Sequence, residues 1–251
     1  MSVDYILWAT DASSVISSII LLAGTVRALQ LARGFAAHAF RNRAYWLAGL
    51  MIALIAGNVA SQIPTPATVV TLQDFIISSI GGDTFVAALL IALVFVDRNL
   101  IVLKELDFFH RDSIRWSRVR VPGLIAMILV SAELVVSFFF VNTNSNLNSI
   151  TLLVILTFFP VVAIVLGYAA TALVLAARRT PDRTMRRFAM LLGIALALGV
   201  ISFTIWIPLS FVTTTEVENF IASLPAVGSA YFLYRAAMSL SPLGRVEKGT
   251  E

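Results

Sequence analysis

Seven apolar stretches, each close to the length at which a helix crosses a lipid bilayer, constrain this chain more than any other feature. A helix rises about 1.5 Å per residue and the hydrocarbon core is about 30 Å thick, so about 20 apolar residues cross it. Charged residues make up only 13% of the chain, about half of the share in soluble domains, which leaves too few polar side chains for a water-soluble surface. We therefore predict an all-α integral membrane protein that folds as one seven-helix bundle over residues 1–240. The predicted spans are Ser13–Arg33, Ala44–Ile63, Leu72–Asp97, Pro122–Val141, Ile150–Ala176, Phe188–Val212 and Val217–Leu240, and residues 241–251 are predicted to form a flexible cytoplasmic tail.

The basic residues predict which way the spans point. All 18 lysines and arginines lie in or toward alternate connections, or toward the end of the last span and in the tail that follows it. The other connections, Pro64–Thr71, Asn142–Ser149 and Thr213–Glu216, contain none. Because basic residues beside a span are retained in the cytoplasm, the amino terminus is predicted to lie outside and the carboxyl terminus inside. This predicts a multi-pass protein of the cell membrane, and it explains the pI of about 9.8 without a nucleic-acid partner.

Two connections on the predicted cytoplasmic side carry helix-boundary signals. Gly34 follows the first span and is predicted to close its helix, since glycine is favoured just past a helix end. Between the fifth and sixth spans, Thr180 is predicted to cap the next helix, with Pro181 in its first turn and Asp182 near its positive end. Both boundaries place the flanking arginines at the membrane surface.

The longest cytoplasmic connection, Leu100–Val121, combines apolar and basic residues. Its apolar side chains can share one face of a helix, with charged side chains opposite. Trp116 is predicted to lie at headgroup depth, where an aromatic ring and neighbouring arginines meet anionic lipid. Two interpretations stay open, a lipid-facing connector or a docking face for a cytoplasmic protein partner. The residues expected to contact lipid headgroups or that partner are Arg111, Arg115, Trp116, Arg118 and Arg120.

Two carboxylic acids, Asp83 and Glu133, fall near the middle of the third and fourth predicted spans. Each is about 16 Å deep, where a charge costs roughly 2.5–3.5 kcal/mol, so both are expected to face the bundle interior. Arg27 is the one basic residue in reach for pairing, although its long side chain can also extend to the cytoplasmic surface. Asn58 is a candidate hydrogen-bond partner. We predict either an ion or polar-ligand site at Asp83, Glu133, Arg27 and Asn58, or hydrogen bonds that only hold the helices together.

Several chemistries are excluded by what the chain lacks. It has no cysteine, and its two histidines, His38 and His110, are on the predicted cytoplasmic side, so no ligand set for haem, iron–sulfur or zinc is available. The seven-helix layout is similar to that of microbial rhodopsins, but retinal needs a lysine amine inside the bundle. The only lysines, Lys104 and Lys248, are cytoplasmic in the predicted topology.

The stretch Gly81-Gly82-Asp83 is similar to the Gly-x-Gly-Asp signature of intramembrane aspartyl proteases. Ile80 stands where the signature has its first glycine, and no second aspartate lies within another span. Acid–base chemistry on a peptide bond needs the pair. No enzyme activity, cofactor or metal site is therefore predicted.

The sequence thus predicts a non-enzymatic membrane protein, sensor-like or a scaffold, that passes a signal or contact to a partner through its basic cytoplasmic face. One alternative is an accessory subunit of a larger membrane complex, with aromatic and aliphatic surfaces buried against other subunits. Another is a small proton- or cation-coupled transporter or channel that uses Asp83 and Glu133. The expected partners are anionic lipids on the cytoplasmic side and a protein in the membrane or at its cytoplasmic face.

Overall fold

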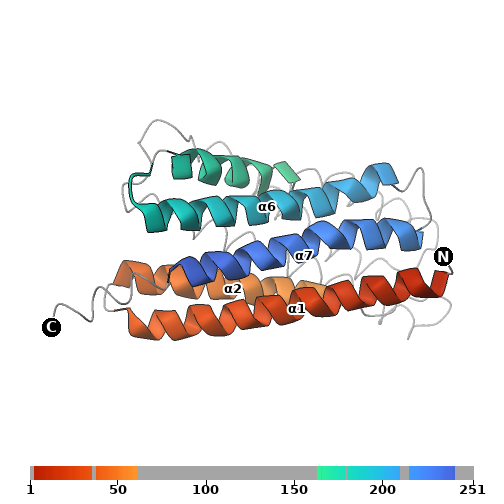
Figure 1. The fold of residues 1–251 in the computed structure, drawn as a ribbon, viewed down its shortest axis with the longest axis horizontal. Helices are drawn as coiled ribbons and strands as arrows, with labels where there is room; N and C mark the ends of the chain where they lie inside the picture. Colours follow the sequence, from red (N-terminus) through yellow and green to blue (C-terminus); the bar gives the residue numbers. More distant parts are fainter. Residues whose placement is uncertain are drawn as a thin grey trace, which may run out of the picture.

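The computed structural model describes residues 3–35, 38–60, 163–164, 166–178, 180–209 and 215–240 (Figure 1). Every regular element in these residues is an α-helix, which confirms the all-α prediction for this part of the chain. The helices are α1 (Val3–Gly34), α2 (His38–Ala60), the helix Leu166–Arg178, α6 (Arg183–Leu209) and α7 (Thr215–Ser239). The third and fourth predicted spans lie outside the described residues.

The described helices lie side by side with their long axes nearly aligned (Figure 1). α1 packs against both α2 and α7, and α7 in turn packs against α6. The helix Leu166–Arg178 lies along α6, on the side away from α7. Consecutive helices run in opposite directions, so α1 begins at one end of the bundle and α7 ends at the other.

Serine hydroxyls link α6 to α7 at two levels. Ser202 of α6 donates a hydrogen bond to the Ala222 carbonyl of α7 at 2.7 Å, and Ser229 of α7 donates one to the Ala195 carbonyl of α6 at 2.8 Å. Ala222 lies in the turn before Pro225, next to Ile221, whose carbonyl loses its helix hydrogen bond because proline has no N–H. The two bonds fix an antiparallel pairing in which the start of α6 meets the end of α7.

Small residues let these helices approach closely, and alanine is the commonest residue of the buried interior. A Cβ atom added at Gly24 of α1 would lie 2.7 Å from Met51 Sδ of α2 and 3.4 Å from Tyr234 Cα of α7. Gly193 of α6 lies equally close to the helix Leu166–Arg178. Each glycine therefore sits where two or more helices meet.

Large apolar side chains also cover the outside of the bundle. On α1, Tyr5 is 72% exposed and Trp8 is 78% exposed, and Ile19 is exposed further along. Two helical stretches, Tyr5–Gly34 and Arg183–Ser202, are long and apolar enough to cross a membrane. The exposed apolar surface and these two helices support a membrane location.

The helices extend beyond the apolar stretches that predicted them. α1 begins at Val3 rather than near Ser13, and it ends at Gly34 as predicted. α6 begins at Arg183, more than one turn before Phe188, where the predicted span begins, and close to the helix start predicted at Thr180–Asp182. Apolar residues mark the part of a helix that suits hydrocarbon, whereas the helix itself continues until its backbone groups are capped or turned.

The residue that caps α6 differs from the prediction. Asp182, not Thr180, is the cap: its Oδ1 accepts a hydrogen bond from the Met185 amide at 2.6 Å. The Thr180 hydroxyl instead donates to the Ala176 carbonyl at 2.8 Å, at the end of the preceding helix. A carboxylate is favoured at this position because it also meets the positive end of the helix dipole.

Candidate functional site

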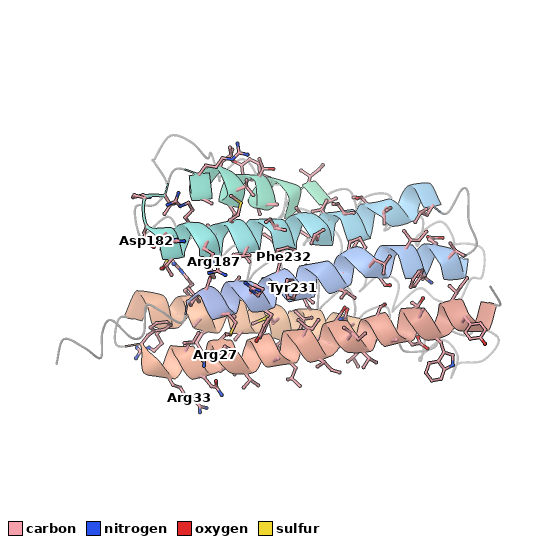
Figure 2. All side chains as sticks on the ribbon, in the orientation of Figure 1. Arg27, Arg33, Asp182, Arg187, Tyr231 and Phe232 are labelled. Atoms are coloured by element: carbon pink, nitrogen blue, oxygen red, sulfur yellow. The ribbon has the colours of Figure 1, made fainter. Side chains whose placement is uncertain are left out.

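The arginines of the described helices gather at one end of the bundle, which we call the arginine-rich end. It comprises the starts of α2 and α6 and the ends of α1, α7 and the helix Leu166–Arg178. Figure 2 shows Arg33 of α1 and Arg187 of α6 toward this end, with Asp182. Within the described ranges, the opposite halves of the five helices contain no lysine or arginine. The described residues thus show the one-sided charge that the sequence predicts for its cytoplasmic side.

One of these arginines is fully buried. Arg43, near the start of α2, is 0% exposed, and its Nη1 donates to Met185 Sδ of α6 at 2.8 Å. Its guanidinium carbon lies 5.5 Å from the centre of the Phe188 ring, a cation–π contact with the next turn of α6. Arg43 precedes the second predicted span, Ala44–Ile63. Burial lowers the pKa of its guanidinium to about 10, so the side chain stays protonated at pH 7. Arg43 therefore joins α2 to α6 in the interior of the arginine-rich end.

An open cavity of about 500 Å³ lies between the first two turns of α6 and the last two turns of α7. Its volume falls within the range of about 300–1,000 Å³ that is typical of small-molecule sites. Of its seven lining residues in the described part of the chain, three are arginines, three carry hydroxyls and none is acidic. The lining residues are Arg183, Thr184 and Arg187 from α6 and Tyr234, Arg235, Met238 and Ser239 from α7.

One of the arginines that line this cavity, Arg235, is oriented by contacts along its own helix. Arg235 Nη1 donates to the Tyr231 hydroxyl at 2.9 Å, and its guanidinium carbon lies 5.8 Å from the centre of that ring. Tyr231 in turn makes an edge contact with Phe232, with ring centres 5.6 Å apart. Figure 2 shows Arg187 extending from α6 toward α7. The arginines thus approach the cavity from both of its walls.

The predicted intramembrane site is only partly within the described residues. Arg27 Nη1 donates to Gln30 Oε1 of its own helix at 3.4 Å, toward the arginine-rich end (Figure 2). Asn58 Nδ2 donates to Ser18 Oγ of α1 at 3.4 Å. Ser18 and Arg27 are nine positions apart on α1, about 14 Å along its axis at about 1.5 Å per residue. Arg27 and Asn58 therefore lie at different levels of the bundle.

The remaining predicted site residues lie outside the described residues. They include both acids of the predicted intramembrane site, so the ion-pathway interpretation stays a prediction. They also include the whole predicted headgroup or partner contact of the longest cytoplasmic connection. These residues are Asp83, Glu133, Arg111, Arg115, Trp116, Arg118 and Arg120.

The cavity between α6 and α7 is absent from the sequence-based site prediction. Arg183 and Arg187 are four residues apart, which places them on one face of a helix, and this spacing is visible in the sequence. Their proximity to Arg235 follows from the pairing of α6 with α7, which local sequence does not reveal. Comparisons with protein-family models, curated proteins and solved structures find no match to this chain.

Proposed function

We propose that this chain is a seven-span membrane protein without enzyme activity, which acts as a sensor-like protein or scaffold through a cytoplasmic, arginine-rich end. The observation that carries the proposal is the cavity between α6 and α7, where three arginines surround an open space. Guanidinium groups offer planar pairs of N–H donors that match carboxylate and phosphate oxygens. A cavity with this lining suits the recognition of an anionic ligand or partner.

The direction of the helices supports the orientation in this proposal. α1 begins at one end of the bundle and α7 ends at the other (Figure 1). A membrane protein whose first and last helices are related in this way crosses the bilayer an odd number of times. Retention of arginines in the cytoplasm then assigns the arginine-rich end to the inside.

A second candidate function is an accessory subunit of a larger membrane complex. The exposed apolar face of α1, with Tyr5, Trp8 and Ile19, favours it because such a face can be buried against another membrane protein. Mass spectrometry of the intact protein in gentle detergent separates the two candidates. Stoichiometric protein subunits support the accessory role, whereas a lone protomer with a bound small molecule supports the sensor-like role.

The orientation is tested by cysteine labelling. Because the native chain has no cysteine, only the introduced cysteine can react. Asp11→Cys and Thr215→Cys, both outside the predicted spans and away from the arginine-rich end, are expected to react with a membrane-impermeant maleimide on intact cells. Gly34→Cys and Pro181→Cys, at exposed positions of the arginine-rich end, are expected to react only after permeabilisation. Labelling is read by a gel shift of the purified protein.

The four positions control for one another, since all lie outside the predicted spans and they differ in their end of the bundle. The reverse pattern would place the arginine-rich end outside and refute the proposed orientation. Equal labelling of all four on intact cells would refute the membrane-spanning arrangement itself.

A further inference from the structure

We propose that the cavity between the start of α6 and the end of α7 is a binding site for a phosphomonoester group. The lipid form of this ligand, a phosphatidic-acid-type headgroup of the inner leaflet, rests on the proposed function, because it requires this end to face the cytoplasm. The cavity chemistry itself rests only on the lining residues, with Arg183, Arg187 and Arg235 supplying the positive charge.

The charge and donor content of the cavity match a terminal phosphate. A phosphomonoester carries a charge of about −1.5 to −2 and three acceptor oxygens, more than the single charge and two free oxygens of a phosphodiester. Three guanidinium groups offer enough paired donors for all three oxygens. Thr184 and Tyr234 line the same space, and each carries a hydroxyl group that can act as a neutral donor.

The positive charge of the cavity comes from its side chains rather than from the backbone. Arg183, Thr184 and Arg187 belong to the first two turns of α6, where the helix dipole is positive, but the facing wall is the end of α7, where the dipole is negative and offsets it. Asp182 is adjacent in sequence, but its carboxylate is engaged with the Met185 amide and it does not line the cavity. The described lining of the cavity therefore contains three arginines and no acidic residue.

The pairing of α6 with α7 holds the two walls in place. The hydrogen bonds from Ser202 and Ser229 set a register that, continued toward the arginine-rich end, brings Arg187 level with the last turns of α7. On that wall, Arg235 is oriented by its hydrogen bond and ring contact with Tyr231. Both walls are thus positioned before a ligand enters, which reduces the ordering cost of binding.

The test uses the full-length protein in a neutral detergent, titrated separately with dioctanoyl phosphatidic acid, dioctanoyl phosphatidylglycerol and inorganic phosphate. Binding is measured as the ligand-dependent rise in the thermal unfolding midpoint. Phosphatidic acid is expected to bind more tightly than phosphatidylglycerol, because only its phosphate is a monoester. Arg187→Gln and Arg235→Gln are each expected to weaken its binding by about 10- to 100-fold, the usual range for loss of a charge-assisted hydrogen bond.

Arg186→Gln is the matched control. Arg186 is exposed on the same turn of α6 and does not line the cavity. Its replacement by glutamine removes the same charge as Arg187→Gln. The affinity of Arg186→Gln for phosphatidic acid is expected to stay within about twofold of that of the native chain. An exposed charge that does not contact the ligand acts on it only through water, where salt screens the interaction. An unchanged unfolding midpoint without ligand shows that a variant has kept its fold. Arg235→Lys keeps the charge but not the paired donors, so it is a more conservative substitution than Arg235→Gln.

Each outcome decides the proposal. Inorganic phosphate that binds as tightly as phosphatidic acid, with the same dependence on Arg187, supports the site and identifies a soluble phosphate source rather than a lipid. Equal losses in Arg186→Gln and Arg187→Gln, or no midpoint shift with any of the three ligands, would overturn it. Arg187-dependent binding together with reversed cysteine labelling would refute the proposed orientation and leave the phosphate site standing.

Discussion

Replacement of Arg43 by alanine is expected to lower the free energy of unfolding by about 3–5 kcal/mol, the range seen when the largest buried side chains are truncated. Arg43 is 0% exposed, and its guanidinium contacts Met185 and the Phe188 ring, both on α6. Alanine would leave a cavity between α2 and α6 and remove the hydrogen bond to Met185 and the ring contact with Phe188. The measurement is unfolding of the purified protein in mixed detergent micelles, followed by circular dichroism.

Two further variants separate the volume of Arg43 from its charge. Arg43→Met keeps most of the volume and can still pack on Phe188, and volume-conserving replacements of this kind usually cost less than about 1.5 kcal/mol. Arg41→Ala is the control, because Arg41 is only half-buried two residues earlier on α2, and it is expected to change stability by no more than about 0.5 kcal/mol. If Arg43→Met is as damaging as Arg43→Ala, the volume argument is wrong and the charged contacts of the guanidinium dominate.

The comparison of Arg41 with Arg43 also shows where sequence reasoning stops. Both are arginines beside the second predicted span, and the one-sided distribution of basic residues correctly predicts that they lie at the end shared by the other described arginines. Nothing in the local pattern shows that one of them is buried. Its burial depends on α6, whose side chains are more than a hundred residues away in the chain. The burial of Glu218 of α7 is likewise not visible in the local sequence: this acid lies near the start of a predicted span, and its side chain is only 3% exposed.

Local signals predicted the helix boundaries better than the site. Gly34 ends α1 as expected, because a helix end is decided by a few neighbouring residues. The start of α6 was also expected near Asp182, although the choice of Thr180 as its cap was wrong. The cavity required two segments, around Arg187 and Arg235, to meet through tertiary pairing. Charge asymmetry predicts the end of the bundle at which arginines gather, but not which of them share a cavity.

Replacement of Gly193 by leucine is expected to destabilise the protein by about 3 kcal/mol, at the upper end of the usual cost of overpacking. Gly193 of α6 faces the helix Leu166–Arg178, where an added Cβ atom would lie 2.9 Å from Val174 Cγ2, 3.1 Å from the Ala170 carbonyl oxygen and 3.2 Å from Leu173 Cβ. The Val174 methyl group can move, but the Ala170 carbonyl belongs to the backbone. A larger side chain must therefore push the two helices apart rather than rotate a neighbour.

The smaller change Gly193→Ala has a matched control that makes the argument specific to this contact. In a helix interior, glycine to alanine normally stabilises by about 1 kcal/mol through backbone entropy. At Gly167 an added Cβ atom meets nothing within 4 Å, so Gly167→Ala is expected to raise the unfolding midpoint. The same substitution at Gly193 is expected to lower it, because the steric cost against Ala170 and Leu173 exceeds the entropic gain. A rise at both positions would show that α6 and the helix Leu166–Arg178 are not packed as closely as these distances require.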